Sequence, residues 1–226
     1  MDKTRWIIFS VIAVGILALL VFLSGGSRVD VADVDHAKIQ APSEQSGQIG
    51  DQIRGNPDAK VILIEYSDPQ CPGCASANPR IKELVEDYGD QIAFVYRHWL
   101  ITSIHPNAKA SAATIEAAGL QGSFWEMLDK VFELQTDWQN LSGTERTDRF
   151  VSYAQELNLD TERFKEDMAS DAVNKKLSFD QALGNQVNVN STPTFFLNGK
   201  MLDQSVWGDD TEFRKAIDAE LAKYND

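Results

Sequence analysis

The chain has 226 residues, of which 43% are hydrophobic, and its formal net charge is −13. This length accommodates one domain with a sizeable core together with appendages. The acidic balance repels phosphate backbones, so nucleic acid is excluded as a natural partner.

The first feature along the chain is an uncharged run of 18 residues at 6–23, which follows Lys3 and Arg5. The run is apolar on every side and just long enough to span a bilayer, so it predicts a transmembrane anchor. Small residues at 24–27 leave cleavage as a signal peptide open. The basic residues place residues 1–5 in the cytoplasm and the remainder outside, where disulfides persist. We therefore predict a single-pass protein of the cell membrane with an extracytoplasmic domain.

Residues 24–50 are rich in Ser, Gly, Asp and Gln and show no sustained period, which predicts a linker. A folded domain is expected over 51–226. Within it, a β-branched apolar run predicts a strand at 60–67, helical spacing predicts a helix at 72–88, and a second apolar run predicts a strand at 92–99. Strand–helix–strand order is typical of a parallel pair.

The region from about 105 to 187 carries successive amphipathic stripes and is predicted to be helical throughout. Short strands follow at 194–197 and 200–202, joined by Asn198-Gly199, which is a strong hairpin signal. An amphipathic helix at 209–224 ends the chain. The order indicates an α/β fold in which one mixed sheet carries a helical insertion.

The chemistry is expected at Cys71 and Cys74, which are the only two cysteines. Cys-x-x-Cys between a strand and a helix is a redox signature. A cysteine at a helix N-terminus gains from unpaired N–H groups and the helix dipole, which stabilise a thiolate. Thiolate is the nucleophile in disulfide exchange, so Cys71 is predicted to attack and Cys74 to resolve. Pro72 suits the first helical position.

Two other uses of the cysteine pair are weaker. A zinc site needs about four ligands, and the chain adds only His36, His98 and His105 in no paired motif. An inert disulfide closing so short a loop would constrain the unfolded chain little. We predict no metal and no cofactor. His98 and His105 are candidates for stabilising the thiolate, although a histidine near a core is more often structural.

The block from Glu65 to Cys74 resembles the active-site strand and turn of DsbA-like thiol–disulfide oxidoreductases, in the thioredoxin superfamily. The segment 191–194 is similar to that superfamily's cis-proline loop, and the long gap between Cys74 and Pro193 resembles the helical insertion of this branch in membrane-anchored bacterial members. The resemblance covers about 50–226. It implies a thioredoxin-like fold whose two halves, strand–helix–strand and strand–strand–helix, are separated by that insertion.

The resemblance also implies roles for individual residues. Pro193 is expected to be cis and to pack against the cysteines, while Thr192 pairs with the substrate chain like an added strand. Glu65 is expected to be a buried acid that exchanges a proton with the resolving thiol. The pair Pro72-Gly73 departs from the histidine- or tyrosine-containing pairs common in the family, which leaves the oxidising power open.

The predicted function is disulfide oxidation. The substrates would be unfolded or reduced exported proteins, and a membrane redox partner would reoxidise the enzyme. A reductase running the same steps backwards is the alternative within this chemistry. An alternative of another class is a substrate-binding or chaperone module that keeps the fold without catalysis.

Overall fold

A computed structural model describes Trp6, residues 9–10, residues 12–15 and residues 29–224. The chain divides into two compact units, Met1–Asp30 and Val31–Asp226. Most of the predicted anchor at 6–23 lies outside the described residues. Among those that are described, no helix combines the length and the apolar character needed to cross a membrane.

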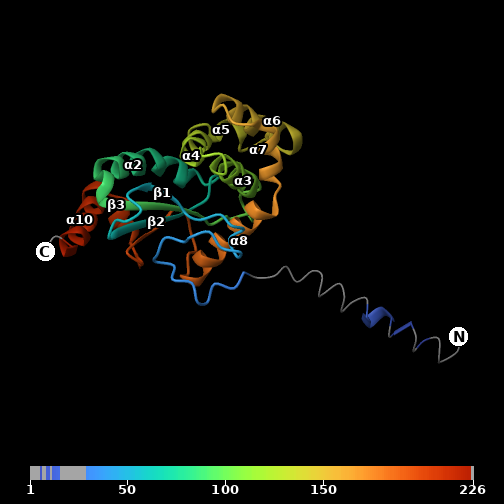
Figure 1. Cartoon of the computed structure of the whole chain (residues 1–226), viewed down its shortest axis with the longest axis horizontal. Helices are drawn as coiled ribbons and strands as arrows, with labels where there is room; N and C mark the ends of the chain where they lie inside the picture. The colour runs from blue at the N-terminus through green and yellow to red at the C-terminus, as the bar shows by residue number, and fades with distance from the viewer. Residues whose placement is uncertain (1–5, 7–8, 11, 16–28, 225–226) are drawn as a thin grey trace. The chain divides into compact units, whose positions relative to one another are not determined.

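The second unit is built on a five-stranded mixed sheet with strand order β1-β3-β2-β4-β5 (Figure 1). Its strands are Gln52–Gly55 (β1), Val61–Ser67 (β2), Ile92–His98 (β3), Thr194–Leu197 (β4) and Lys200–Met201 (β5). The central pair β2 and β3 is parallel, and the other pairs are antiparallel. This thioredoxin-like α/β arrangement agrees with the predicted mixed sheet.

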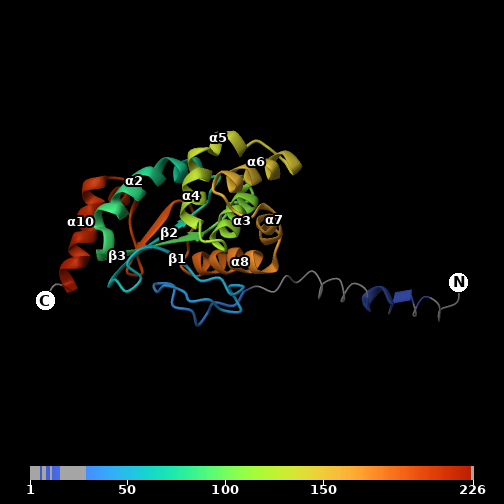
Figure 2. The same ribbon diagram turned by 45° about the horizontal axis from the view of Figure 1, so that its top comes forward.

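The helices fall into two groups, according to whether they lie inside or outside the gap in the sequence between β3 and β4. Those outside the gap are α2 (Pro72–Tyr88), α9 (Gln204–Trp207) and α10 (Asp210–Leu221), with 3-10 turns η1 (Gly89–Gln91) and η2 (Ala222–Tyr224). Those within it are α3 (Ala108–Gly119), α4 (Phe124–Glu133), α5 (Gln135–Trp138), α6 (Gly143–Glu156), α7 (Thr161–Met168) and α8 (Asp171–Gln186). Figures 1 and 2 show α3 to α7 gathered at one end of this unit and α10 at the other.

Two of the three apolar clusters among the described residues follow this division. One joins the sheet to α2 and α10 and contains Leu63, Leu84 and Phe213. The other lies within the helical insertion around Trp138, and it also includes Cys71 and Cys74. The cysteine turn therefore lies where the thioredoxin-like half meets the insertion.

A single carboxylate fixes the insertion against the rest of the unit. Asp129 of α4 accepts hydrogen bonds from Arg54 of β1 (3.2 Å) and from Lys82 (2.8 Å) and Asn78 (3.3 Å) of α2. The Arg54 guanidinium also lies 4.6 Å from the ring centre of Trp125, which is on α4. These contacts set the position of α4 relative to the helix that carries the cysteines.

The folded unit begins earlier than the sequence indicates. Residues 31–50, expected to be linker, belong to the compact unit, and Val31, Ser46 and Ile49 within them are buried. Arg97 of β3 donates to the carbonyl oxygens of His36 and Lys38, both at 2.7 Å. The segment is held largely through its backbone, which is why its side chains show no hydrophobic period.

Candidate active site

The Cys71–Cys74 turn lies where β2 gives way to α2. Cys71 is the N-cap residue with extended backbone angles, and Pro72 occupies the first turn of the helix. The Cys71 N–H donates to the carbonyl oxygen of Asp68 (2.9 Å), which closes the turn. Both thiols are free; Cys71 is 9% exposed, whereas Cys74 is fully buried. Of the two sulfurs, only that of Cys71 can be reached from outside.

The loop before β4 faces this turn. The Thr192–Pro193 bond is cis, as predicted. The Cys71 Sγ lies 3.5 Å from the carbonyl oxygen of Thr192. Because β4 pairs antiparallel with β2, the residues just before β4 are brought beside the residues just after β2. Gly73 lies between the two, since a Cβ added there would stand 3.6 Å from the Cys71 sulfur and 3.8 Å from Pro193.

The two thiols have opposite acidities. The pKa of Cys71 falls to about 5, chiefly through its interaction with the Cys74 thiol, which outweighs the effect of burial, and the neighbouring Thr192 side chain and the backbone N–H groups of Gly73 and Cys74 add to the fall. Burial raises the pKa of Cys74 well above its usual value, and its hydrogen bond to Cys71 and the charge of Glu65 add to this. At neutral pH the nucleophile is therefore Cys71, while Cys74 keeps its proton.

Glu65 stands on β2 and is 4% exposed. Burial raises the pKa of its carboxyl to about 7, the nearby Ser67 hydroxyl and the charge of Arg80 oppose the rise, and the charge of Cys71 adds to it. The carboxyl is thus poised to exchange a proton near neutral pH. Its proposed exchange with the resolving thiol stays a prediction.

Sequence reasoning missed a group of polar side chains behind Glu65. The parallel register pairs Glu65 with Tyr96 and Ser67 with His98, so all four face the same side of the sheet. His98 Nε2 lies 3.2 Å from Oε1 of Glu116 on α3, and the rings of Tyr96 and His98 are 5.1 Å apart. We call Glu65, Ser67, Tyr96, His98 and Glu116 the buried polar file.

Every member of the buried polar file is at most 4% exposed. Within the part of the chain that the structure describes, the hydroxyls of Ser67 and Tyr96 and both ring nitrogens of His98 have no well-aligned hydrogen-bond partner. Burial raises the pKa of Tyr96 well above its usual value, and the charges of Glu65 and Cys74 follow as causes. Buried polar groups without an aligned partner are rare in folded proteins.

The two histidines considered as thiolate partners lie elsewhere. His98 belongs to the buried polar file. His105 Nδ1 lies 2.8 Å from Oδ2 of Asp68, which also accepts the N–H of Ile101 at 2.8 Å. Since the carbonyl of Asp68 holds the N–H of Cys71, His105 supports the cysteine turn from behind. No contact between either histidine and a cysteine sulfur occurs among the described residues.

Side chains from the helical insertion hold the cysteine turn in place. Gln135 of α5 donates to the carbonyl oxygens of Pro69 (2.9 Å) and Cys71 (3.2 Å). The Asn107 N–H donates to Oε1 of Gln70 at 2.6 Å. Sequence patterns do not reveal these partners, because they lie more than thirty residues from the turn and are ordinary polar residues of a helical region.

The sequence predicts no metal site. The described residues contain no cluster of three or more His, Cys, Asp or Glu side chains arranged to hold an ion. The arrangement that is present is a Cys71 thiol with a lowered pKa, a buried Cys74 thiol and a cis-proline loop beside them. Together with the helical insertion, these features define the fold of a DsbA-like thiol–disulfide oxidoreductase.

Comparison with known proteins agrees. The family model described as Thioredoxin matches residues 48–219, and the chain belongs to this family. A thioredoxin-like oxidoreductase from Silicibacter pomeroyi DSS-3 is 25% identical, with a TM-score of 0.58 over 74% of this chain and 92% of that one. Alpha-DsbA1 from Wolbachia pipientis shares the fold at 22% identity and a TM-score of 0.61, over 76% of this chain and 92% of that one.

A longer relative is similar over part of its length. The protein named Na(+)/H(+) antiporter NhaA 1 from Salinispora arenicola is 38% identical over 150 residues, which are 66% of this chain and 22% of that protein. The chain thus spans about a fifth of the length of this relative.

Proposed function

We propose that the protein is an extracytoplasmic disulfide oxidase that introduces disulfides into exported proteins through the Cys71–Cys74 pair. The observation that carries this proposal is the lowered pKa of Cys71, at about 5, beside a Cys74 whose pKa is raised. A stabilised thiolate favours the reduced enzyme, and a disulfide whose reduced form is stabilised is a strong oxidant.

The reaction balances in two exchanges. A substrate thiolate attacks Sγ of Cys71 in the enzyme disulfide, and Cys74 leaves as a thiolate that takes a proton from Glu65. A second substrate thiolate then attacks the substrate sulfur of the mixed disulfide, and Cys71 leaves as its stable thiolate. The substrate loses two electrons and the enzyme gains them. The low pKa of Cys71 makes it the better leaving group in the second step.

The reduced enzyme has to be reoxidised, and we assign this step to a membrane redox partner. The apolar run at 6–23 supports a location at the cell membrane, with residues 1–5 cytoplasmic and the thioredoxin-like domain outside. Such an anchor would raise the concentration of the enzyme near its partner. Ion antiport is not part of the proposal, because the similarity to the named antiporter covers 22% of that protein.

The test is the thiol–disulfide equilibrium of the full chain in glutathione buffers, with Cys71→Ser and Cys74→Ser as controls. A potential above about −200 mV supports the oxidase, and a value near −270 mV, roughly that of thioredoxin, makes the protein a reductase. Cys74→Ser, loaded beforehand as the mixed disulfide of Cys71 with glutathione, should release glutathione and trap mixed disulfides with reduced client proteins, and Cys71→Ser should trap none. If neither exchange nor trapping occurs, the protein is a binding module and both redox functions are wrong.

A further inference from the structure

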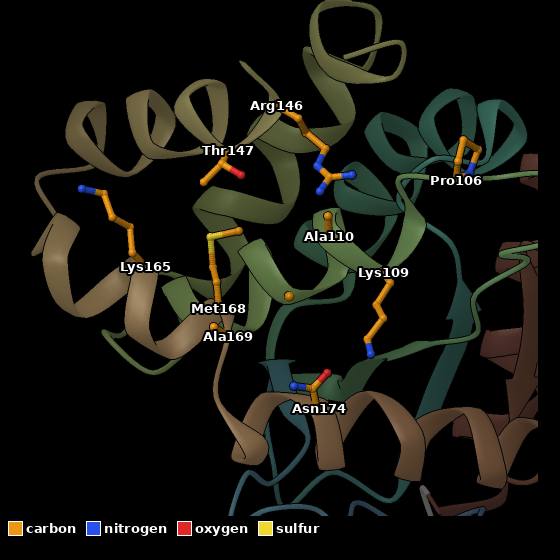
Figure 3. Close-up of a pocket in the computed structure, with 10 residues that line it drawn as sticks. Pro106, Lys109, Ala110, Arg146, Thr147, Lys165, Met168, Ala169 and Asn174 are labelled. Atoms are coloured by element: carbon orange, nitrogen blue, oxygen red, sulfur yellow. The ribbon is translucent and has the colours of Figure 1, made fainter. Parts of the chain in front are cut away.

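A cavity of about 410 Å³ opens in the helical insertion, away from the cysteine turn and the cis-proline loop (Figure 3). It is lined by residues of α3, α6, α7 and α8 and of the turn before α3. These residues are Pro106, Lys109, Ala110, Ala113, Arg146, Thr147, Lys165, Met168, Ala169 and Asn174. None of them is acidic, although the chain carries a net charge of −13. The cavity is therefore a basic site on an acidic protein.

Two of the lining cations lack a counter-charge. No ion pair joins Arg146 or Lys109 to any acid among the described residues. Arg146 donates from Nη1 to Oδ1 of Asn107 (2.7 Å), while its Nε is buried without a partner. The third cation, Lys165, pairs with Glu162 at 2.7 Å. The Nε atom is closed off from solvent, so the donor that Arg146 can offer in the cavity is Nη2, for which the described residues supply no hydrogen-bond partner.

Figure 3 shows how these side chains lie. The guanidinium of Arg146 points toward Ala110, and the ammonium of Lys109 points toward Asn174, so both reach into the space between the helices. Lys165 points away from them. The free positive charge of the cavity thus comes from Arg146 and Lys109, on two different helices.

The rest of the lining is apolar and small. Ala110, Ala113 and Ala169 present methyl groups, and Met168 presents a flexible thioether that adapts to the shape of a ligand. The volume falls within the range of roughly 300–1,000 Å³ that is typical of small-molecule sites. Arginine binds planar carboxylates through two parallel hydrogen bonds. A small molecule with a carboxylate group and a short apolar chain fits this combination of features.

We propose that this cavity binds a small aliphatic carboxylate. The carboxylate pairs with the terminal guanidinium nitrogens of Arg146, and the charge of Lys109 adds to the positive potential of the cavity. The aliphatic chain lies against Met168 and the alanine methyl groups. Nη2 of Arg146 supplies the donor, and Thr147 and Asn174 add polar atoms at the edge. No lining residue takes part in thiol–disulfide exchange, so the site is independent of the proposed redox function.

The probe is octanoate, titrated calorimetrically into the full chain held in zwitterionic nanodiscs, with empty nanodiscs as the blank. Binding should saturate at one octanoate per chain. Arg146→Gln and Lys109→Gln should each weaken it at least tenfold, and Arg146→Lys should restore part of the loss. Lys60→Gln is the matched control, because Lys60 is also exposed and unpaired but lies outside the cavity.

Three further arms separate the head from the tail and from the membrane. Acetate has the charge without the chain, octanol has the chain without the charge, and both should bind at least tenfold more weakly than octanoate. Equal binding of either one overturns the proposal, as does the lack of saturable octanoate binding. The proposal is also overturned if the calorimetric binding signal appears only with nanodiscs that contain anionic phospholipid, because the ligand of the cavity would then be a lipid headgroup.

The variants guard against a trivial loss of structure. Lys109 is exposed, so Lys109→Gln leaves the packing of α3 untouched and remains informative even if Arg146→Gln unfolds. Ala110→Leu fills the cavity without removing a charge, and it should abolish octanoate binding while the circular dichroism spectrum stays unchanged. Retained affinity in Ala110→Leu would place the carboxylate elsewhere and overturn the assignment.

Discussion

Two buried polar clusters lie on opposite faces of the same strand, and they differ in how well their members are partnered. Tyr96 and His98 of β3 belong to the buried polar file behind Glu65, and Arg97 between them points to the other face. There Arg97 joins Asp51, Lys176 and Asp180 in what we call the ion cluster. Both clusters are almost completely inaccessible.

The ion cluster is closed by opposite charges. Arg97 Nη2 lies 2.7 Å from Asp51, and Lys176 Nζ lies 3.1 Å from Asp51 and 2.7 Å from Asp180. Burial by itself would raise the pKa of Asp51, but the charges of Lys176 and Arg97 outweigh it and lower the pKa. The Asp51 carboxyl is therefore held in its charged form, whereas burial raises the pKa of Asp180 despite the charge of Lys176. The role of the ion cluster is to hold the N-terminal segment, β3 and α8 together.

Glu65 in the buried polar file has no such compensation. No cation among the described residues forms an ion pair with Glu65, and burial moves its pKa to about 7. Equal burial thus has opposite outcomes for two carboxyl groups: the pKa of Asp51 is lowered and the pKa of Glu65 is raised. Paired charges are fixed and support the fold, whereas an acid without a close cation titrates near neutral pH and is available for proton transfer.

The largest expected effect breaks the ion cluster. Arg97→Met leaves the carbonyls of His36 and Lys38 without their donor and leaves Asp51 with Lys176 alone. We expect a loss of about 3–5 kcal/mol in the free energy of unfolding. The pKa of Cys71, followed by thiolate absorbance, should not move. Urea titration measures the first quantity, and a loss below about 1 kcal/mol would contradict the structural role.

The next effect concerns the pH dependence of stability through Glu65. Its carboxyl has a pKa of about 7 in the folded protein and 4.5 as the ordinary value. The folded state therefore holds the proton more tightly, so stability is complete below about pH 4.5 and declines by about 3 kcal/mol as the pH rises through 7. Glu65→Gln should remove this decline.

The thiols complicate that measurement, since they act in the opposite sense. The lowered pKa of Cys71 makes the reduced protein more stable as the pH rises from about 5 toward 9. Unfolding should therefore be followed in a Cys71→Ser background, with and without Glu65→Gln. If both proteins show the same pH dependence, the carboxyl is not the titrating group.

A smaller effect is expected where the insertion holds the cysteine turn. Gln135→Ala leaves the buried carbonyl of Pro69 without its donor, which should cost about 1–3 kcal/mol. The Cys71 carbonyl loses one of two donors and keeps the N–H of Ala75. The rate of Cys71 alkylation should change as well, because the turn is no longer fixed. Thr136→Ala is the matched control, since Thr136 is the exposed neighbour. Equal behaviour of the two variants would remove Gln135 from the support of the site.

The smallest expected effect comes from removing one tyrosine hydroxyl on each face of the sheet, that of Tyr96 or that of Tyr66. The Tyr96 hydroxyl has no aligned partner, so Tyr96→Phe should change stability by less than about 1 kcal/mol. The Tyr66 hydroxyl accepts from Arg97 at 3.1 Å, so Tyr66→Phe should cost more. Thermal unfolding of the two variants ranks them, and the reverse order would mean that the buried polar file is fully partnered.

Local sequence patterns determined much of the fold. The β-branched run at 60–67 became β2 (Val61–Ser67), the run at 92–99 became β3 (Ile92–His98), and the helix at 72–88 is α2 with the same bounds. The amphipathic stripes predicted the helical insertion, and the cysteine spacing predicted the reactive turn. Each of these signals comes from residues close together in the chain, where apolar periodicity reports directly on burial.

The tertiary structure alone decided the start of the unit at Val31, the edge strand β1 and the partners of the site. β1 has one exposed and three half-buried residues, and it exists because it pairs with β3. Ser67, Tyr96 and Glu116 joined Glu65, and Gln135 reached the cysteine turn, only through strand register and helix packing. Polar contacts of this kind leave no period in the sequence, because a hydrogen bond needs one partner at one place and that place is set by the fold.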